Sequence, residues 1–318
     1  MVTTRAIRRD ELENWLAVGA DDPANERLVG RIRGAWADGS GAPQLTFVAQ
    51  DDSGAPIGRL AFTHASVASA LPDVHEALAI GLWLPWAAPE AVEIGRRLVV
   101  DGLPALPPDV IALDGHANPE YMVGSDVRRA VFEAAGLPLF QEKEGFVWTP
   151  ASSPPPAADP RLTFRSIDEV GTGLYAATMS RCTVGTLDRQ DRYYADLVGT
   201  EGWGPEMLAF LTDDDAPTWL LAFDPAGEIV GYVALGDFDQ PGRGTIMHIG
   251  VVPEHRGRGY VGELLDACNQ AALDRHFRTV LSDVDVENGP MLAAMERAGH
   301  LSSATPWHVH HYRLELRR

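Results

Sequence analysis

The chain has 318 residues, enough for one large or two ordinary domains with full hydrophobic cores. Its composition, 45% hydrophobic and 22% charged, is globular, and no run of 18 apolar residues predicts a membrane span. With 26 basic and 45 acidic residues the formal charge is -19, which argues against nucleic acid or an anionic membrane as a partner. The acidity suits a cationic substrate such as an amine, or it serves solubility alone.

The sequence also offers no targeting or metal signal. The first residues, Met-Val-Thr-Thr-Arg-Ala-Ile-Arg-Arg-Asp, lack the apolar core of a signal peptide. Two cysteines, Cys182 and Cys268, form neither a disulfide framework nor a C-x-x-C metal pattern. We therefore expect a cytoplasmic protein without a bound metal.

The two halves of the chain open with the same pattern of elements. Charged stretches at residues 10–19 and 167–179 predict a helix in each half. Each is followed by two β-rich runs around an Asp and Gly turn, at residues 46–62 and 218–234, which predict a hairpin. Later matches, such as Ala135-Gly136 against Ala298-Gly299, keep the same order. The sequence therefore predicts two copies of one domain.

A proline-rich segment separates the copies. Residues 150–160 contain five prolines and no apolar side chain larger than alanine, which predicts an extended, semi-rigid linker. We therefore place the domain limits at residues 1–149 and 161–318.

Residues 245–262 predict a strand, a glycine-rich loop and the start of a helix. Pro253 ends the β-branched strand, and apolar residues recur on one helical face from Val261 onward, with Glu263 on the opposite, polar face. Gly257 and Gly259 would let a ligand approach the N-H groups at the helix start, where the helix dipole favours an anion. With Arg256 and Arg258 adding positive charge, the pattern predicts a phosphate or pyrophosphate site.

A dinucleotide site is the alternative, because residues 257–262 spell G-x-G-x-x-G and Asp283 or Asp285 could bind a ribose. Two features argue against it. Pro-Glu-His-Arg separates the strand from the first glycine, and about 50 residues remain after the loop, too few for further βαβ units.

The run Val251-Val-Pro-Glu-His-Arg-Gly-Arg-Gly-Tyr260, followed by a predicted helix, a strand and Asn288, resembles the acyl-CoA-binding core of the GCN5-related N-acetyltransferase (GNAT) family. That loop reads Arg or Gln, any, any, Gly, any, Gly or Ala; Arg256 and Gly259 fit it, and Val261 departs from it. The resemblance implies an α/β fold of the α+β type: two tandem GNAT-like domains, each a mixed, mostly antiparallel sheet flanked by helices. It implies acetyl-CoA as cofactor, no metal, and contacts to acetyl-CoA from Ile249, Gly250, Val251, Arg256, Gly257, Arg258, Gly259, Tyr260, Val261, Gly262, Asn288 and Met291.

The first copy differs at the loop. After Leu84 it reads Pro-Trp-Ala-Ala-Pro-Glu-Ala, without arginine or glycine, and such a loop cannot form a backbone cradle for phosphate. We therefore interpret residues 1–149 as a degenerate GNAT-like domain that lacks the pyrophosphate loop, and residues 161–318 as the acetyltransferase domain. The alternative is that the first half binds CoA by another route.

The catalytic positions of the family are not filled in this chain. Many members carry a glutamate where this chain has Thr245, and a tyrosine acid where it has Met295. By chemistry the candidates for the base are His248, Asp283, Asp285 and Glu287, although a histidine on a buried strand is also a common core residue. Of these we take His248, Asp285 and Glu287 as the candidate catalytic residues. The resemblance implies direct transfer of an acetyl group from acetyl-CoA to the primary amine of a small molecule. The alternative is a non-catalytic acyl-CoA sensor or assembly module.

The resemblance also implies where the acceptor binds. Residues 181–196 and 201–206 would face the substrate, and the Gly and Pro residues of the second segment predict a loop. The C-terminal run 307–314 contains three histidines, but no cysteine or nearby carboxylate completes a metal site. We expect this run to form a strand in the wall of the acceptor site.

Overall fold

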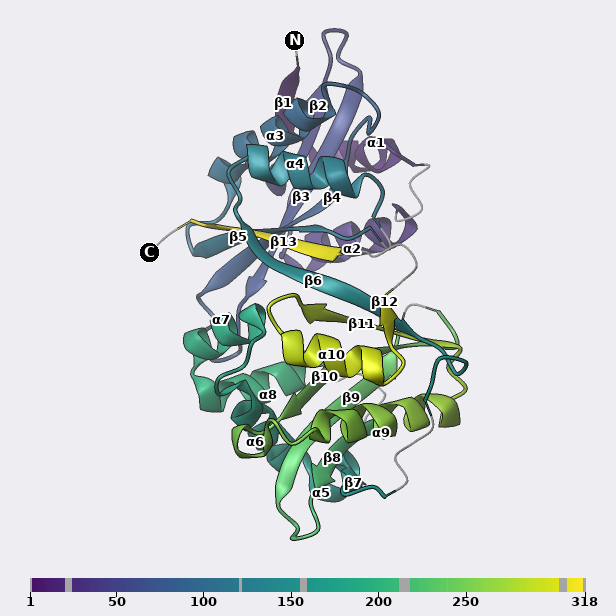
Figure 1. Ribbon diagram of the computed structural model, residues 1–318. Helices are drawn as coiled ribbons and strands as arrows, with labels where there is room; N and C mark the ends of the chain where they lie inside the picture. The colour runs from purple at the N-terminus through teal and green to yellow at the C-terminus, as the bar shows by residue number, and fades with distance from the viewer. Residues whose placement is uncertain are drawn as a thin grey trace. The chain divides into compact units, whose positions relative to one another are not determined.

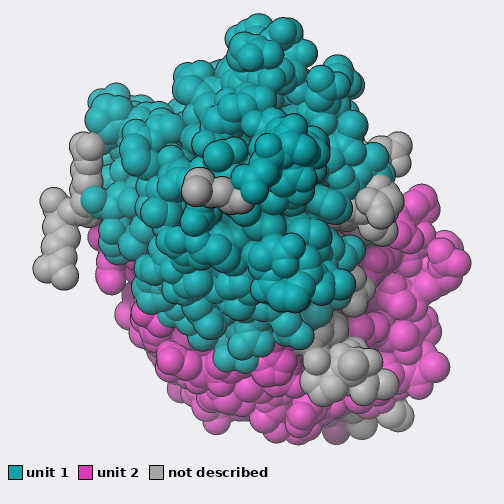
Figure 2. Space-filling view, turned by 90° about the horizontal axis from the view of Figure 1, so that it is seen from above, with its two compact units in different colours: residues 1–142, 309–318 teal, residues 143–308 magenta. Residues whose placement is uncertain are grey.

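The computed structural model (Figure 1) describes residues 2–20, 25–119, 122–154, 159–211, 218–238, 240–302 and 308–316. They form two compact units, coloured separately in Figure 2: unit 1, residues 1–142 with 309–318, and unit 2, residues 143–308. By contacts, the units divide within strand β6 (Leu139–Trp148). The domain limits drawn from the sequence, 149 and 161, stay a prediction.

Unit 1 has its helices on both sides of one sheet. The helices are α1 (Leu12–Ala17), α2 (Asn25–Asp38), α3 (Ala91–Gly102) and α4 (Ser125–Ala134), with 3-10 turns at Arg9–Glu11, Pro43–Leu45 and Leu103–Ala105. The strands, in sheet order, are β1 (Thr3–Ala6), β2 (Thr46–Gln50), β3 (Pro56–Ser66), β4 (His75–Trp83), β5 (Val110–Ala117) and β13 (His308–Glu315). β4 and β5 are parallel, and the other neighbours are antiparallel.

Unit 2 repeats this order. Its helices are α5 (Ile167–Val170), α6 (Thr172–Thr183), α7 (Arg189–Val198), α8 (Thr200–Leu211), α9 (Tyr260–Asp274) and α10 (Gly289–Arg297), with a 3-10 turn at Pro253–His255. The strands, in sheet order, are β7 (Thr163–Ser166), β8 (Trp219–Phe223), β9 (Ile229–Asp237), β10 (Arg243–Val251), β11 (Thr279–Asp285) and residues 143–148 of β6, to which β12 (Leu301–Ser302) also pairs. β10 and β11 are the parallel pair.

Each sheet therefore has five strands from its own half and a sixth from elsewhere in the chain. Residues 309–315 complete unit 1, and residues 143–148 complete unit 2. The predicted fold class is confirmed, because each unit is a mixed, mostly antiparallel sheet flanked by helices. The predicted hairpins are confirmed as β2–β3 and β8–β9.

The strand predicted at residues 307–314 is found as β13, but it belongs to the sheet of unit 1, and its place in the wall of the acceptor site stays a prediction. β13 pairs with β5 in unit 1, where Arg313, 3% exposed, donates two hydrogen bonds of 3.0 Å to Asp114 and forms an ion pair with Glu76. His311 Nε2 lies 2.9 Å from the same Asp114 carboxylate. Because buried charges need partners, these acids on β4 and β5 fix the strand in unit 1. Trp307 lies outside the described residues.

Side chains alternate across both sheets, so each sheet has a core on each face. In unit 1, Phe47 packs with residues of α3 and α4, whereas Val48 packs with residues of α1 and α2. In unit 2, Tyr232 packs with residues of α6 and α8, whereas Val233 packs with residues of α9. The face on which a strand residue lies therefore decides which helices it meets.

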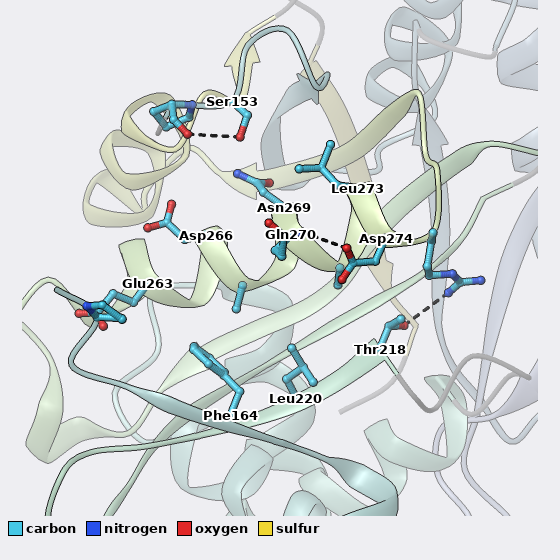
Figure 3. Close-up of a pocket in the computed structure, with 15 residues that line it drawn as sticks. Ser153, Phe164, Thr218, Leu220, Glu263, Asp266, Asn269, Gln270, Leu273 and Asp274 are labelled. Carbon is cyan, nitrogen blue, oxygen red and sulfur yellow. Dashed lines mark hydrogen bonds between the residues drawn. The ribbon is translucent and has the colours of Figure 1, made fainter. Parts of the chain in front are cut away.

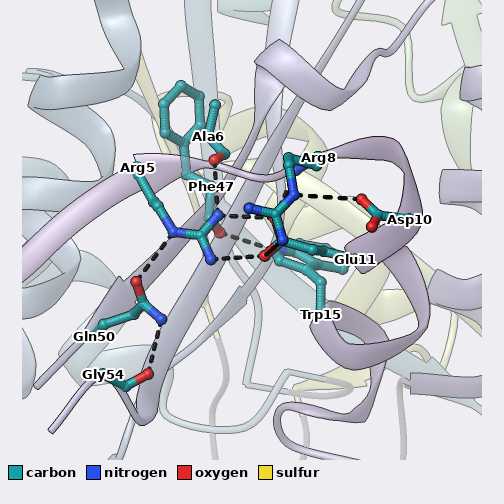
Figure 4. Close-up of polar contacts among 9 residues, drawn as sticks. All are labelled: Arg5, Ala6, Arg8, Asp10, Glu11, Trp15, Phe47, Gln50 and Gly54. Carbon is teal, nitrogen blue, oxygen red and sulfur yellow. Dashed lines mark hydrogen bonds and ion pairs between the residues drawn. The ribbon is translucent and has the colours of Figure 1, made fainter.

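Polar contacts hold the first helices of unit 1 (Figure 4). Arg5 donates to both carboxylate oxygens of Glu11 at 2.8 and 2.9 Å, and the backbone N-H of Arg8 donates to the same group at 2.7 Å. These hydrogen bonds, that of Arg5 first, lower the pKa of Glu11 to about 2. Trp15 Nε1 donates to the Phe47 carbonyl at 2.7 Å and fixes α1 to β2.

Residues 201–206 were predicted as a loop, and this was wrong: they lie inside α8. Pro205 has no N-H to offer the carbonyl of Glu201, four residues earlier, and the Ser180 hydroxyl of α6 donates to that carbonyl instead at 3.1 Å. Gly204 is required by packing, because a Cβ there would stand 2.0 Å from the Ala176 carbonyl oxygen. The Gly and Pro residues thus permit close contact between two helices.

The other predicted helices are found with small changes. The stretch at residues 10–19 is a 3-10 turn followed by α1, and the stretch at 167–179 is α5 and α6, separated by Gly171. No helix within the described ranges is long and apolar enough to cross a membrane.

Candidate functional site

The loop before α9 presents bare backbone N-H groups. Gly257 and Gly259 have φ values of 74° and 79°, a left-handed conformation that favours glycine, and α9 starts at Tyr260. Within the described part of the chain, the N-H groups of residues 257–261 donate no hydrogen bond to another protein group. Unpaired N-H groups at the positive end of a 15-residue helix are suited to an anion, and the phosphate or pyrophosphate site at this loop stays a prediction.

Arg256 supports this loop from the side. Its guanidinium donates to the carbonyls of Val251 at 3.0 Å, Val184 at 2.7 Å and Cys182 at 2.7 Å. Its donors are therefore directed at protein groups, and it ties the loop to the segment between α6 and α7. The Arg258 carbonyl accepts from Arg161 at 3.1 Å, and the exposed guanidinium of Arg258 lies 3.4 Å from His255, where its charge can face a ligand.

Glu263, expected on the exposed face of α9, is only 9% exposed. Arg161 explains its burial: the Arg161 Nε and backbone N-H both donate to the Glu263 carboxylate at 2.7 Å. The guanidinium of Arg161 also stacks over Tyr260 at 4.5 Å from the ring centroid. Arg161 thus fixes the first turn of α9 and neutralises the one carboxylate in it.

The central strands separate beside this loop. β10 pairs with β9 along its length to Val251, but pairs with β11 only from Arg243 to Thr245. From Ile246 onward, the second edge of β10 has no partner strand among the described elements. The predicted contacts Ile249, Gly250 and Val251 all lie on this open edge.

One cavity joins the loop and the open edge. Its volume is about 400 Å³, and its wall includes most of the predicted acyl-CoA contacts: Ile249, Gly250, Val251, Arg256, Gly257, Gly259, Tyr260, Val261, Asn288 and Met291. Arg258 and Gly262 lie outside that wall. Asn288 also caps α10, because its side chain accepts from the Met291 N-H at 3.3 Å.

A bulge in β10 brings His248 into the same cavity. The pairing of β9 and β10 shifts between Ile246 and His248, so that Met247 is the extra residue. A bulge reverses the alternation of side chains beyond it. His248 consequently faces the helices α6 to α8, where its ring lies 5.3 Å from that of Trp203 and lines the cavity.

Both nitrogens of His248 have partners. Nδ1 lies 2.6 Å from the Tyr232 hydroxyl, and Nε2 lies 3.3 Å from Oδ1 of Asp191 on α7. Burial would lower the pKa of His248, but the charge and hydrogen bond of Asp191, aided by the charge of Asp188, raise it above its usual value of 6.5. Asp191 and Tyr232 also line the cavity, and burial keeps the pKa of Tyr232 far above that of a free phenol.

Of the three candidate catalytic residues, only His248 lines this cavity. Asp285 is 2% exposed, and its carboxylate accepts hydrogen bonds from the backbone N-H groups of Arg189 at 2.9 Å and Glu287 at 2.8 Å. It therefore stabilises the start of α7 and the turn after β11. Glu287 is exposed and lies 3.6 Å from Arg192. The two carboxylates have structural partners, and their predicted catalytic role is not supported by their position.

Sequence reasoning missed Asp191 and Tyr232. The segment 181–196 was expected to face the substrate, but nothing in it singled out Asp191, which is 57 positions from His248. Tyr232 is one of several bulky residues in a buried strand. The available signal was its alternation with Val233, which puts it on the α6 and α8 face.

A larger cavity, of about 570 Å³, lies along the outer side of α9 (Figure 3). Its described wall includes Phe164, Leu220 and polar residues of α9, and contains neither a histidine nor a glycine-rich turn. The polar residues of α9 are Glu263, Asp266, Asn269, Gln270 and Asp274. Pro154 and Pro160, which flank residues outside the description, also border it. The chemistry of the smaller cavity is more specific, and we place the functional site there.

A sequence profile of the acetyltransferase (GNAT) family matches residues 186–300. Residues 186–300 are a GNAT-family domain. The GNAT domain includes the anion loop, the open strand edge and the Tyr232, His248 and Asp191 group. Unit 2 therefore contains a domain of an acetyltransferase family. A search of curated proteins gives no match.

Solved structures share the fold along the whole chain. A GCN5-related N-acetyltransferase from Sphaerobacter thermophilus is 18% identical, with a TM-score of 0.61 over 100% of this chain and 96% of that one. A tandem GNAT protein from the clavulanic acid biosynthesis pathway is 19% identical, with a TM-score of 0.56 over 100% and 99%. A GCN5-related glucosamine N-acetyltransferase region of a fungal β-N-acetylglucosaminidase is 15% identical, with a TM-score of 0.64, and this chain spans 38% of that protein. At these identities the likeness establishes a tandem GNAT fold.

Proposed function

We propose that unit 2 transfers an acetyl group from acetyl-CoA to the primary amine of a small molecule, by direct attack with both substrates bound. The observation that carries this proposal is a single cavity that joins a bare anion loop, an open strand edge and a histidine paired with a carboxylate. The membership of residues 186–300 in an acetyltransferase family supports it.

The residues have distinct tasks in this proposal. The N-H groups of residues 257–261 and the charge of Arg258 hold the pyrophosphate. The open edge at residues 249–251 pairs with the pantetheine arm and directs a backbone N-H at the thioester carbonyl. Asn288 and Met291 border the arm on the other side. Acetyl-CoA, when bound, supplies the acetyl group as a thioester.

The acceptor is small and basic in this proposal. A cavity of about 400 Å³ that also holds the end of the donor leaves room for a compact molecule. Asp191 places a carboxylate in that wall, and the net charge of -19 favours the approach of a cation. An amine protonated in solution fits both features, and it loses its proton to water before attack.

A non-catalytic acyl-CoA sensor remains the second candidate, favoured by the residues at the usual acid and base positions. Met295 is 1% exposed in the core, and Thr245 lies in the last paired step of β10 and β11. Neither a thioether nor an aliphatic hydroxyl has a pKa suited to a general acid or base near neutral pH.

Calorimetric titration of acetyl-CoA, desulfo-CoA and NADH, followed by thiol release with a panel of amines, tests the proposal. We expect one CoA site, no NADH binding and thiol release with at least one small amine. Binding without release for every amine would favour the sensor, and NADH binding would contradict both candidates.

A further inference from the structure

The sequence shows no acid that could protonate the sulfur expelled from the thioester, because Met295 stands where the family usually has a tyrosine. A thiolate expelled from a thioester needs a proton, and the cavity offers few groups that can supply one. Cys182 also lines it, but burial raises the pKa of this thiol to about 12. His255 and Tyr260 line the end of the cavity beside the glycine loop, in the 3-10 turn and the first turn of α9. The Tyr232 hydroxyl and His248 are the donors beside the open strand edge.

His248 cannot reach a substrate through either ring nitrogen. Nδ1 is occupied by the Tyr232 hydroxyl at 2.6 Å and Nε2 by Asp191 at 3.3 Å. A proton on His248 therefore leaves or arrives through one of these two partners.

Of the two partners of His248, Tyr232 is the one that lies beside the open edge of β10. Its backbone is paired with that of Gly250, and a Cβ on Gly250 would stand 3.0 Å from the Tyr232 ring. Gly250 lies where the proposed function puts the thioester end of the pantetheine arm. The tyrosine ring is thus directly beneath the reacting end of the donor, and it lines the cavity.

We propose that Asp191, His248 and Tyr232 form a proton relay that protonates the leaving sulfur, with Tyr232 as the group that touches it. This inference rests on the proposed function and names its acid. It places the acid on β9, opposite Gly250, instead of on α10, where Met295 stands.

The protons balance along this chain of hydrogen bonds. As the acceptor nitrogen bonds to the carbonyl carbon, the carbon-sulfur bond breaks with its electron pair on sulfur. Tyr232 gives its hydroxyl proton to that sulfur and takes the Nδ1 proton of the His248 cation. Asp191 keeps the Nε2 proton in place throughout. The acceptor nitrogen loses its proton to water, and water returns one proton to His248 through the Tyr232 hydroxyl before the next cycle.

The groups around His248 fit this role. Asp191 and Asp188 on α7 stabilise its cation, and Lys143 on β6 opposes it. Lys143 is itself paired with Asp188 at 3.7 Å and with Asp283 at 3.3 Å. Tyr232 and Cys182, on β9 and α6, are neutral, so the acidic groups on α7 favour a protonated His248.

Tyr232→Phe is the direct test, with Tyr175→Phe as its matched control. Tyr175 is also 0% exposed in the same core, but its hydroxyl donates at 3.1 Å to the Val233 carbonyl. We expect Tyr232→Phe to slow thiol release about 100-fold, with calorimetric affinity for acetyl-CoA unchanged. Tyr175→Phe should keep the wild-type rate.

The pH dependence gives a readout that a structural role would not change. An acid works only while His248 is protonated, so the rate should fall as pH rises through the pKa of His248, which lies above 6.5. Asp191→Asn should move this falling limb to lower pH, and Tyr232→Phe should abolish it. NMR titration of His248 in the protein without ligands should show the same decrease of its pKa in Asp191→Asn.

Three results would decide against the relay. They are a Tyr232→Phe rate within threefold of wild type, a falling limb unmoved by Asp191→Asn, and an unchanged His248 pKa in that variant. Each would overturn the relay while the wild-type enzyme still transfers the acetyl group. If the wild-type protein releases thiol with no amine, the proposed function fails and the relay fails with it.

Discussion

The sheets of the two units have the same strand order but different residues at equivalent positions. In unit 2, Tyr232 on β9 is paired with Gly250 on β10; in unit 1, Arg59 on β3 is paired with Trp83 on β4. Arg59, 1% exposed, donates to the carbonyls of Trp15 at 3.2 Å and Leu16 at 2.9 Å, so it holds the end of α1. The position that places the Tyr232 hydroxyl beside a cavity in unit 2 thus holds a structural arginine in unit 1.

The region after the central strand differs in the same way. In unit 1, Arg128 of α4 donates to the Leu82 carbonyl at 2.7 Å, on the segment that corresponds to the open edge of β10. The Arg128 guanidinium also stacks on Trp86, 4.7 Å from its ring centroid. Side chains of unit 1 thus cover the segment that corresponds to a cavity wall in unit 2. The strand order alone therefore does not create a cavity. The side chains along the open strand edge decide whether that space stays empty or is filled by the protein itself.

The largest expected effect comes from adding a charge to the loop of unit 2. Gly259→Asp should weaken acetyl-CoA binding about a thousandfold, since a carboxylate about 4 Å from a pyrophosphate charge costs about 4 kcal/mol at the protein surface. Calorimetry measures the affinity. Gly259→Asn has nearly the same shape without the charge and should lose far less.

The same change in unit 1 is the control for that prediction. Ala87 is exposed in the loop that lacks glycines, and Ala87→Asp should leave CoA affinity and a stoichiometry of one unchanged. A loss of binding in Ala87→Asp would show that unit 1 also holds CoA.

A second difference between the units concerns acid stability. His300 of unit 2 and Leu137 of unit 1 occupy the same place after an Ala-Gly pair. His300 is 0% exposed, and burial lowers its pKa to about 4. Between pH 6.5 and 4 the unfolded chain binds a proton that the folded unit does not, so the free energy of unfolding should fall by about 3 kcal/mol as pH decreases.

His300→Leu should remove that pH dependence. Hydrogen exchange of β6 and β11 between pH 4 and 6.5 follows the stability of unit 2. The variant also removes the contact of 2.9 Å between His300 Nε2 and the Asn269 side chain, which changes stability at every pH. The measured quantity is therefore the change of stability with pH, not the stability at pH 7. An unchanged slope in His300→Leu would show that other groups set the acid sensitivity.

The smallest effect is expected from opening unit 1. Arg128→Met removes the hydrogen bond to Leu82 and should lower the stability of unit 1 by about 2 kcal/mol, measured by denaturant unfolding. It should create no second CoA site, because the loop after Leu84 has no bare backbone cradle. Arg31→Met, on the exposed side of α2, should change stability by less than about 0.5 kcal/mol. A second CoA site in Arg128→Met would contradict the comparison.

Local sequence patterns predicted the fold well. Alternation and turn residues gave the hairpins, and Gly257 and Gly259 gave the loop, because in each case neighbours in sequence decide the conformation. The helical position of residues 201–206 was missed because it depends on Ser180, a residue of another helix.

The site itself was predicted only in part. His248 was named from its chemistry, but its direction depends on the bulge at Met247, which the sequence does not mark. Its partners Asp191 and Tyr232 come from other elements, brought together only by the packing of α7 on the sheet. The exchange of the sixth strands was equally invisible, since β13 finds its partners through Asp114, 197 positions before His311.

That exchange sets the order in which the chain can finish folding as it leaves the ribosome. Unit 2 has all six strands of its sheet once residue 285 has been made, because residues 143–148 are synthesised before the rest of it. Unit 1 is begun first but lacks a strand until residues 309–315 emerge. During synthesis the edge of β5 therefore stays open while the whole GNAT domain is translated, and the half that starts first is completed last.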